Sequence, residues 1–228
     1  GSYSARNLST SSNNTVLGYN AFDQATTGNA DNIMIGRESG GLIVDDASHN
    51  IGIGALAFSA GDANNIGNIA IGAGSLNSTG TNAHTGTIAI GQDALTALTS
   101  GAGNIAIGYQ AGGNKTTESQ SVMIGYQAGQ TTNDDNGSNA VLIGYQAGRK
   151  LYAGSGDNIA IGHLAMGAGS RHAAGSDKNI AIGSQAMEGV LASGSAHNVC
   201  IGYQAFTAST SGAANVIIGN HSGDAMNT

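Results

Sequence analysis

A short pattern that ends in glycine occurs twelve times along the chain, and this repeat constrains the fold more than any other feature. Its commonest form is NIAIG, and successive closing glycines are 17 to 21 residues apart. That length suits one small coil of short strands and turns. The closing glycines are Gly18, Gly36, Gly54, Gly72, Gly91, Gly108, Gly125, Gly144, Gly162, Gly183, Gly202 and Gly219. The sequence predicts an all-β parallel solenoid, or β-roll, of twelve repeats over residues 14–223, with a lead-in at 1–13 and a tail at 224–228.

Two columns of the repeat are expected to form its interior. The residue three before each closing glycine is always β-branched, and the residue one before it is Leu17 or isoleucine. Ile69 and Ile71 are one such pair. Residues two apart on a strand point to the same face. We therefore expect these columns to stack as apolar ladders inside the roll.

The residue two before each closing glycine lies on the opposite face of the strand, and it is apolar or small in every copy. A strand that is apolar on both faces is covered on both faces, and one coil per repeat offers no second layer. We expect identical chains to cover this column, so that a charge at Ala106 abolishes association and oxidation links Cys200 between chains. The expected interface residues are Ala70, Ala89, Ala106, Met123, Leu142, Ala160, Ala181 and Cys200.

Asparagine is the first residue of most copies of the pattern, as at Asn32, Asn50 and Asn68. Its short amide suits a tight turn. Identical amides on successive coils can also form a hydrogen-bonded ladder. We assign this column a structural role.

The charges argue against nucleic acid as a partner. The net charge is −7, which repels phosphate backbones and anionic membrane surfaces. The cations are scattered, and only Arg149 and Lys150 are adjacent.

No stretch approaches the ~18 apolar residues that span a bilayer, so we expect no membrane insertion. Gly1-Ser2 is typical of a cloning remnant, and the single Cys200 excludes an intrachain disulfide.

The repeat resembles a known family of surface fibres. NIAIG followed by two variable positions and Ala is similar to the head repeats of YadA-like trimeric autotransporter adhesins. IGYQAG, at 107–112, 124–129 and 143–148, also resembles repeats of bacteriophage tail-fibre proteins. The resemblance implies a left-handed parallel β-roll that assembles as a parallel homotrimer. It further implies adhesion to a cell-surface glycan or protein receptor, and an extracellular location on a cell surface or a virion tail fibre.

Tyrosine and glutamine follow the closing glycine in three consecutive copies, which predicts an aromatic and amide ladder. A sugar or a protein receptor can stack on exposed aromatic rings. Packing between coils or between chains is the alternative. The residues that we assign to receptor binding are Tyr109, Tyr126, Tyr145, Gln110, Gln127 and Gln146.

Metal binding has less support in the sequence than receptor binding. The histidines lack the short spacing of a zinc site, although His163 and His221 are candidates for an ion on a threefold axis. Asp31 and Asp157 directly precede the pattern and Asp177 lies one residue earlier, as in calcium-binding β-rolls, but most copies lack the aspartate. A calcium-stabilised secreted β-roll is therefore an alternative, and we assign no cofactor and no metal site.

Catalysis is not expected. Serine, histidine and aspartate lie in loops without the strand–turn–helix context of a nucleophile, and Glu38, Glu118 and Glu188 lie in different coils. The threonine pairs at 116–117 and 131–132 leave an ice-binding solenoid as a second alternative, although they do not recur in register. We expect a structural and adhesive protein that is not an enzyme.

Overall fold

The structure, a computed structural model, describes residues 3–59, 64–77, 84–130, 138–151, 156–167, 175–189, 192–207 and 212–223. These residues contain twelve short strands and no helix, which confirms the predicted all-β solenoid. The chain divides into two compact units, Gly1–Thr117 and Glu118–Thr228, where the sequence predicts one repeat domain over 14–223. The predicted tail at 224–228 lies outside the described residues.

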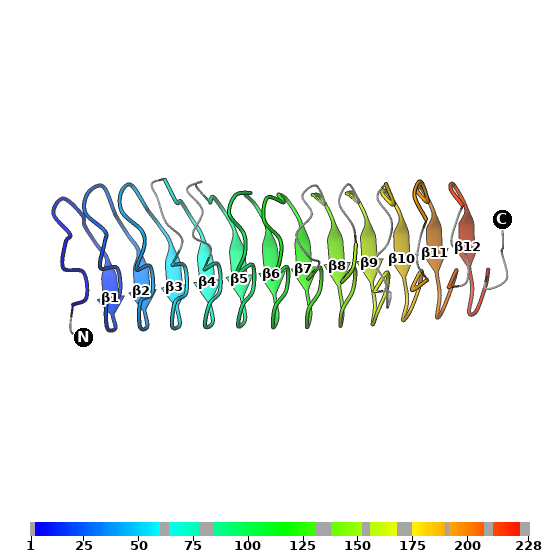
Figure 1. Ribbon diagram of the computed structural model, residues 1–228, viewed down its shortest axis with the longest axis horizontal. Coiled ribbons are helices and arrows are strands. Elements are labelled where there is room, and N and C mark those ends of the chain that lie inside the picture. The colour runs from blue at the N-terminus through cyan, green and yellow to red at the C-terminus, as the bar shows by residue number, and fades with distance from the viewer. Residues whose placement is uncertain are drawn as a thin grey trace. The chain divides into compact units, whose positions relative to one another are not determined.

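Each unit contains one parallel sheet whose strands follow one another in chain order, with one strand per coil (Figure 1). The strands of unit 1 are β1 (Thr15–Leu17), β2 (Ile33–Ile35), β3 (Ile51–Ile53), β4 (Ile69–Ile71), β5 (Ile88–Ile90) and β6 (Ile105–Ile107). The strands of unit 2 are β7 (Val122–Ile124), β8 (Val141–Ile143), β9 (Ile159–Ile161), β10 (Ile180–Ile182), β11 (Val199–Ile201) and β12 (Val216–Ile218).

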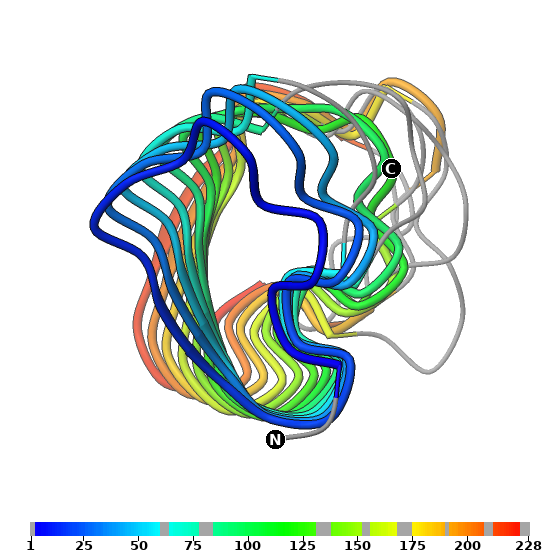
Figure 2. The ribbon, with the colours of Figure 1, turned by 90° about the vertical axis from the view of Figure 1, so that its left-hand side faces the viewer.

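Equivalent positions of the repeat stack directly on one another within each unit. Ala70 pairs with Ala89 and Ile71 with Ile90, so each column of the sequence becomes a ladder along the sheet. The ladder continues beyond the strand, because the N–H of Gly72 donates to the carbonyl of Ile53 at 2.8 Å. A tight turn follows each strand and a longer loop precedes the next, and Figure 2 shows both along the stacking direction.

The closing glycine is required by the coil that stacks against it. Gly72 has φ +128°, which favours glycine. A Cβ atom there would lie 2.7 Å from the carbonyl oxygen of Gly91 in the next coil. This close approach of two backbones, together with the positive φ, explains the closing glycine wherever a further coil stacks on it, and Gly219 in the last coil keeps the same φ, +135°.

The strand face that points into the coil is the opposite of the one expected from the sequence. The middle residue of nearly every strand is buried within the single chain, and the first and third residues are mostly half-buried. The assignment of the middle column to an interface between chains was therefore wrong, as was the assignment of the isoleucine columns to the interior. The residues that move to the interior are Ala70, Ala89, Ala106, Met123, Leu142, Ala160, Ala181 and Cys200, all 0–1% exposed.

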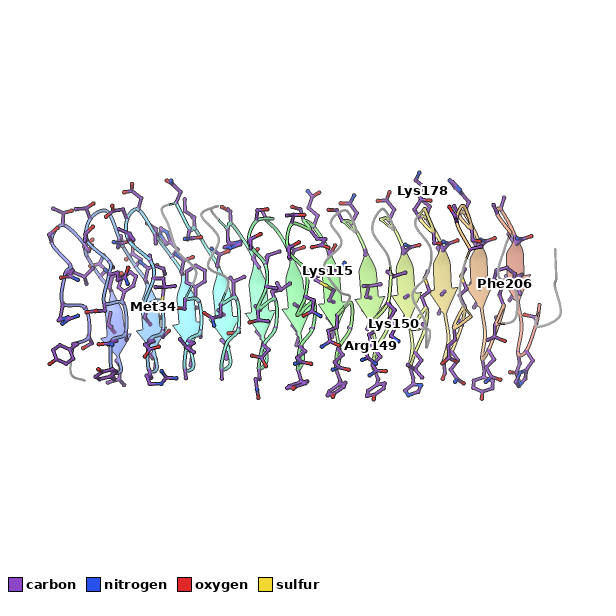
Figure 3. All side chains as sticks on the ribbon, viewed as in Figure 1. Met34, Lys115, Arg149, Lys150, Lys178 and Phe206 are labelled. Carbon is purple, nitrogen blue, oxygen red and sulfur yellow. The ribbon has the colours of Figure 1, made fainter. Side chains whose placement is uncertain are left out.

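The physical reason is that a coil of this length encloses a narrow interior. The middle residue of the strand shares that interior with the residue four after the closing glycine, such as Leu76, Met166 or Phe206. In most coils one of these two positions holds a small residue and the other a larger one, as at Ala70 and Leu76 or Met34 and Gly40, which indicates that the pair fills a confined space. In Figure 3, Met34 and Phe206 lie inside the coils of their units.

The asparagine ladder is confirmed and buried. Asn50 donates through Nδ2 to Oδ1 of Asn32 at 3.0 Å and to the carbonyl of Asn65 at 2.7 Å. The N–H of Asn50 also donates to Oδ1 of Asn32, at 3.0 Å. These bonds satisfy a buried amide that would otherwise be costly. The equivalent position in the next coil but one is Thr87, where the amide ladder is interrupted.

Candidate functional site

The outward side of the strands is the main candidate surface. We call the first and third side chains of the strands the apolar strand face. It is built of valine and isoleucine, with Thr15 and Leu17 in β1. Most of these side chains are half-buried, but Ile107 is 36% exposed and Ile218 66% exposed. Since β-branched residues are stiff and suit strands, the sequence makes this surface regular and rigid.

No charge interrupts the apolar strand face, because none of the twelve described strands contains a charged residue. The cations lie elsewhere. In unit 2, Arg149 and Lys150 lie on one side of the strands and Lys178 on the other (Figure 3). Lys178 is 3.5 Å from the carboxylate of its neighbour Asp177. These described cations do not gather into the stripe that a phosphate backbone requires.

The tyrosine and glutamine ladder forms in unit 2. The rings of Tyr126 and Tyr145 stack with centroids 5.2 Å apart and planes inclined by 7°, and His163 stacks on Tyr145 at the same distance. Nε2 of Gln146 donates to Oε1 of Gln127 at 2.8 Å. Neighbouring rings therefore cover both faces of Tyr145. A sugar ring stacks on an aromatic face, so this geometry favours packing between coils over sugar stacking at Tyr145.

The other residues assigned to receptor binding lie in unit 1. Tyr109 is 38% exposed and follows β6, with Gln110 beside it in a left-handed conformation. Their place after the strand corresponds to that of the pairs in unit 2. A role of either group in receptor binding stays a prediction.

The two histidines that are candidates for an ion on a threefold axis each pack against an aromatic ring. His163 belongs to the tyrosine stack, and His221 packs edge-on against Tyr203 with centroids 5.1 Å apart. Among the residues that the structure describes, no three His, Cys, Asp or Glu side chains come close enough to hold a metal ion. The threonine pair at 131–132 lies outside the described ranges. In the same ranges, no helix is long and apolar enough to cross a membrane.

Cys200 lies in the interior of its coil and is fully buried. Burial raises the pKa of its thiol to about 12, because the thiolate would lose its hydration. The expectation that oxidation links Cys200 between chains is therefore wrong, because the thiol lies inside its own coil. In the sheet Cys200 is in register with Ala181 and Ile217, which are also buried, so it belongs to the interior column of unit 2.

The residues that sequence reasoning missed are the outward isoleucines. A signal existed in the sizes of the side chains. In most coils the middle strand residue and the residue four after the glycine differ in size in opposite directions, as Met34 with Gly40 and Ala70 with Leu76, which indicates that both fill one confined space.

Comparisons of the chain with protein-family models, with curated proteins and with solved structures find no match. The resemblance to fibre repeats therefore rests on the residues of the repeat, and the functional argument rests on the surfaces described above.

Proposed function

We propose that this chain is a structural and adhesive segment of a homotrimeric surface fibre. In this proposal the fibre belongs to a cell surface or a virion tail, its coils are left-handed, and its loops bind a receptor or serve as a spacer. The observation that carries the proposal is the apolar strand face, which a single chain leaves partly exposed in both units.

The size of the apolar strand face supports association. Six strands about 4.8 Å apart and three residues wide make a surface of roughly 25 Å by 10 Å in each unit. Each unit by itself then presents roughly 250 Å², which approaches the few hundred Å² at which contiguous apolar patches on monomers mark interaction sites.

The chemistry of the face favours further copies of the same chain as the occupant. A contact between two such faces buries valine and isoleucine without desolvating any charge, so it avoids the main cost of burying polar groups. Identical chains also offer ladders of the same spacing, so that the side chains of one copy can meet those of another in every coil. Three narrow faces meeting around one axis fit the parallel homotrimer that the resemblance to fibre repeats implies.

One strand of unit 2 provides a matched test. Ala181 lies in the interior, Ile182 on the apolar strand face and Ser184 in the turn that follows. Light scattering and sedimentation of the wild type should give three times the chain mass of 22.4 kDa. Ile182→Asp should reduce this mass to that of one chain, because it places a charge in the contact between copies. Ser184→Asp should leave the trimer intact.

Ala181→Asp serves as a third arm. It buries a charge in the interior of the coil and should unfold unit 2, which circular dichroism would report as lost β structure. A wild-type protein that sediments as a single chain at micromolar concentration contradicts the proposal. So does an Ile182→Asp variant that stays trimeric.

A further inference from the structure

Unit 1 contains a polar groove that the fibre assignment does not use. Its volume is about 410 Å³, within the range of small-ligand sites. The groove extends over successive coils, between the residues two after each closing glycine and those five or six after it. These are turn residues outside the strands. Its hydrogen-bonding side chains are Asn20, Asp23, Gln24, Glu38, Ser59 and Asn77.

The groove is hollow at Gly41. In neighbouring coils the same position holds Asp23, Ser59 and Asn77, whose side chains line the groove, whereas Gly41 contributes only backbone. A Cβ atom at Gly41 would lie 3.1 Å from the carbonyl oxygen of Glu38, so a side chain there requires this carbonyl to shift by a few tenths of an ångström. The glycine thus leaves space that other coils fill.

The two carboxylates of the groove form ion pairs with arginine side chains. Arg6 donates from Nε and Nη2 to the two oxygens of Asp23, both at 2.7 Å, and this bonding lowers the pKa of Asp23. Nη1 of Arg37 donates to Oε1 of Glu38 at 2.8 Å. Neither arginine is among the lining residues. The groove therefore offers no unmatched cation to an anionic ligand and little net negative charge to a cationic one.

Amides and carboxylates together both donate and accept hydrogen bonds. Leu42 and Leu56 add an apolar wall to the same groove. An uncharged sugar presents the complementary surface, with hydroxyl groups around a ring that has apolar C–H faces. We propose that this groove binds a short segment of a neutral oligosaccharide, with the amides of Gln24 and Asn77 contacting its hydroxyl groups. Its role as the receptor site of a fibre rests on the proposed function, but the binding itself does not.

The test is calorimetric titration of the full chain with neutral tetrasaccharides of glucose, mannose, galactose and N-acetylglucosamine. A tetrasaccharide of uronic acids and spermidine serve as charged probes. We expect at least one neutral probe to bind, and both charged probes to bind at least tenfold more weakly. Gly41→Gln should weaken the neutral probe at least tenfold, because its side chain fills the groove. Gln24→Ala should weaken it severalfold without adding bulk.

Gly113→Gln is the matched control. Gly113 occupies the same position of its own coil, outside the groove, and a Cβ atom there would meet the carbonyl oxygen of Gln110 at 3.3 Å. This variant should bind like the wild type. The proposal is overturned if no neutral probe binds the wild type, if a charged probe binds more tightly, or if the two glycine variants lose binding equally.

The sedimentation mass separates this inference from the proposed function. A monomeric wild type whose sugar binding depends on Gly41 would contradict the fibre and support the groove. A trimer that binds none of the neutral probes would contradict the groove and support the fibre.

Discussion

The sulfur of Met34 occupies the space into which a side chain on Gly40 would project, since a Cβ atom on Gly40 would lie 2.8 Å from it. In the coil of β4 the same two positions hold Ala70 and Leu76. The backbone is left-handed at both Gly40 and Leu76, with φ of +63° and +47°, so the turn accepts a large side chain there. The two positions therefore share one volume, which is filled from the strand in one coil and from the turn in the other.

Met34→Ala and Gly40→Leu should therefore compensate for each other. Met34→Ala leaves a cavity and should cost about 2–5 kcal/mol of unfolding free energy. Gly40→Leu overpacks the same space and should cost about 1–3 kcal/mol. The double variant should recover most of both losses, less the ~1 kcal/mol by which a left-handed backbone disfavours leucine. Urea unfolding of the four proteins measures the coupling.

Gly67→Leu provides the control for this cycle. Gly67 is also left-handed, with φ +67°, but a Cβ atom there meets nothing within 4 Å. Its effect should add to that of Met34→Ala without coupling. Additive losses for Met34→Ala with Gly40→Leu would contradict the shared volume.

The sequence predicted the strands and the solenoid but not which strand face points inwards. The reason is that both faces of the strands are apolar, so no alternation of apolar and polar residues indicates which face points inwards. Isoleucine pairs such as Ile69 and Ile71 are therefore expected in the interior from sequence, and Ala70 between them in an interface between chains. The polar groove could not be predicted because it depends on turn side chains of several coils converging, which the pattern of one coil does not encode.

Thr87 marks a weak point of the asparagine ladder. Its N–H donates to Oδ1 of Asn68 at 3.0 Å, as the asparagines of other coils do. Its hydroxyl oxygen is buried and has no hydrogen-bond partner among the described residues. Thr87→Asn should extend the ladder, because the new Nδ2 can donate to Oδ1 of Asn68. It should raise the unfolding free energy by about 1 kcal/mol.

The reverse change, Asn50→Thr, is the control for the ladder. It removes two donated bonds from a buried amide and should lower the unfolding free energy by about 1–3 kcal/mol. Thermal unfolding of both variants beside the wild type measures the effects. Equal or lower stability of Thr87→Asn would show that the interruption costs nothing.

Cys200 should be unreactive in the folded protein. Its thiol is buried and its pKa is raised to about 12, so almost no thiolate exists at pH 8. A disulfide reagent should label it at least 100-fold more slowly in the native state than in guanidinium, as expected for a buried thiol. Ser184→Cys in a Cys200→Ser background should react rapidly and shows that the reagent is active. Similar labelling rates of Cys200 in both states would contradict its position in the core.

His84 should make unit 1 less stable in mild acid. Its side chain is buried, and burial lowers its pKa below the usual 6.5, with a weaker opposing effect of the Gly101 carbonyl 3.4 Å from Nδ1. Below pH 6.5 the unfolded chain binds a proton that the folded chain does not, so stability is full above pH 6.5 and falls as the pH drops. The loss should reach up to about 1.4 kcal/mol per pH unit.

The measurement is thermal unfolding from pH 8 to pH 5. His84→Gln keeps a side-chain amide that can donate to the Gly101 carbonyl. In this variant the loss of stability between pH 8 and pH 5 should be smaller by the contribution of the His84 imidazole. His49→Gln is the control, because His49 is exposed, with Nε2 3.8 Å from Oδ2 of Asp31. The His49→Gln variant should lose as much stability in acid as the wild type, because His84 is still present. Identical slopes for the wild type and His84→Gln would mean that the buried imidazole does not govern the acid sensitivity of this coil.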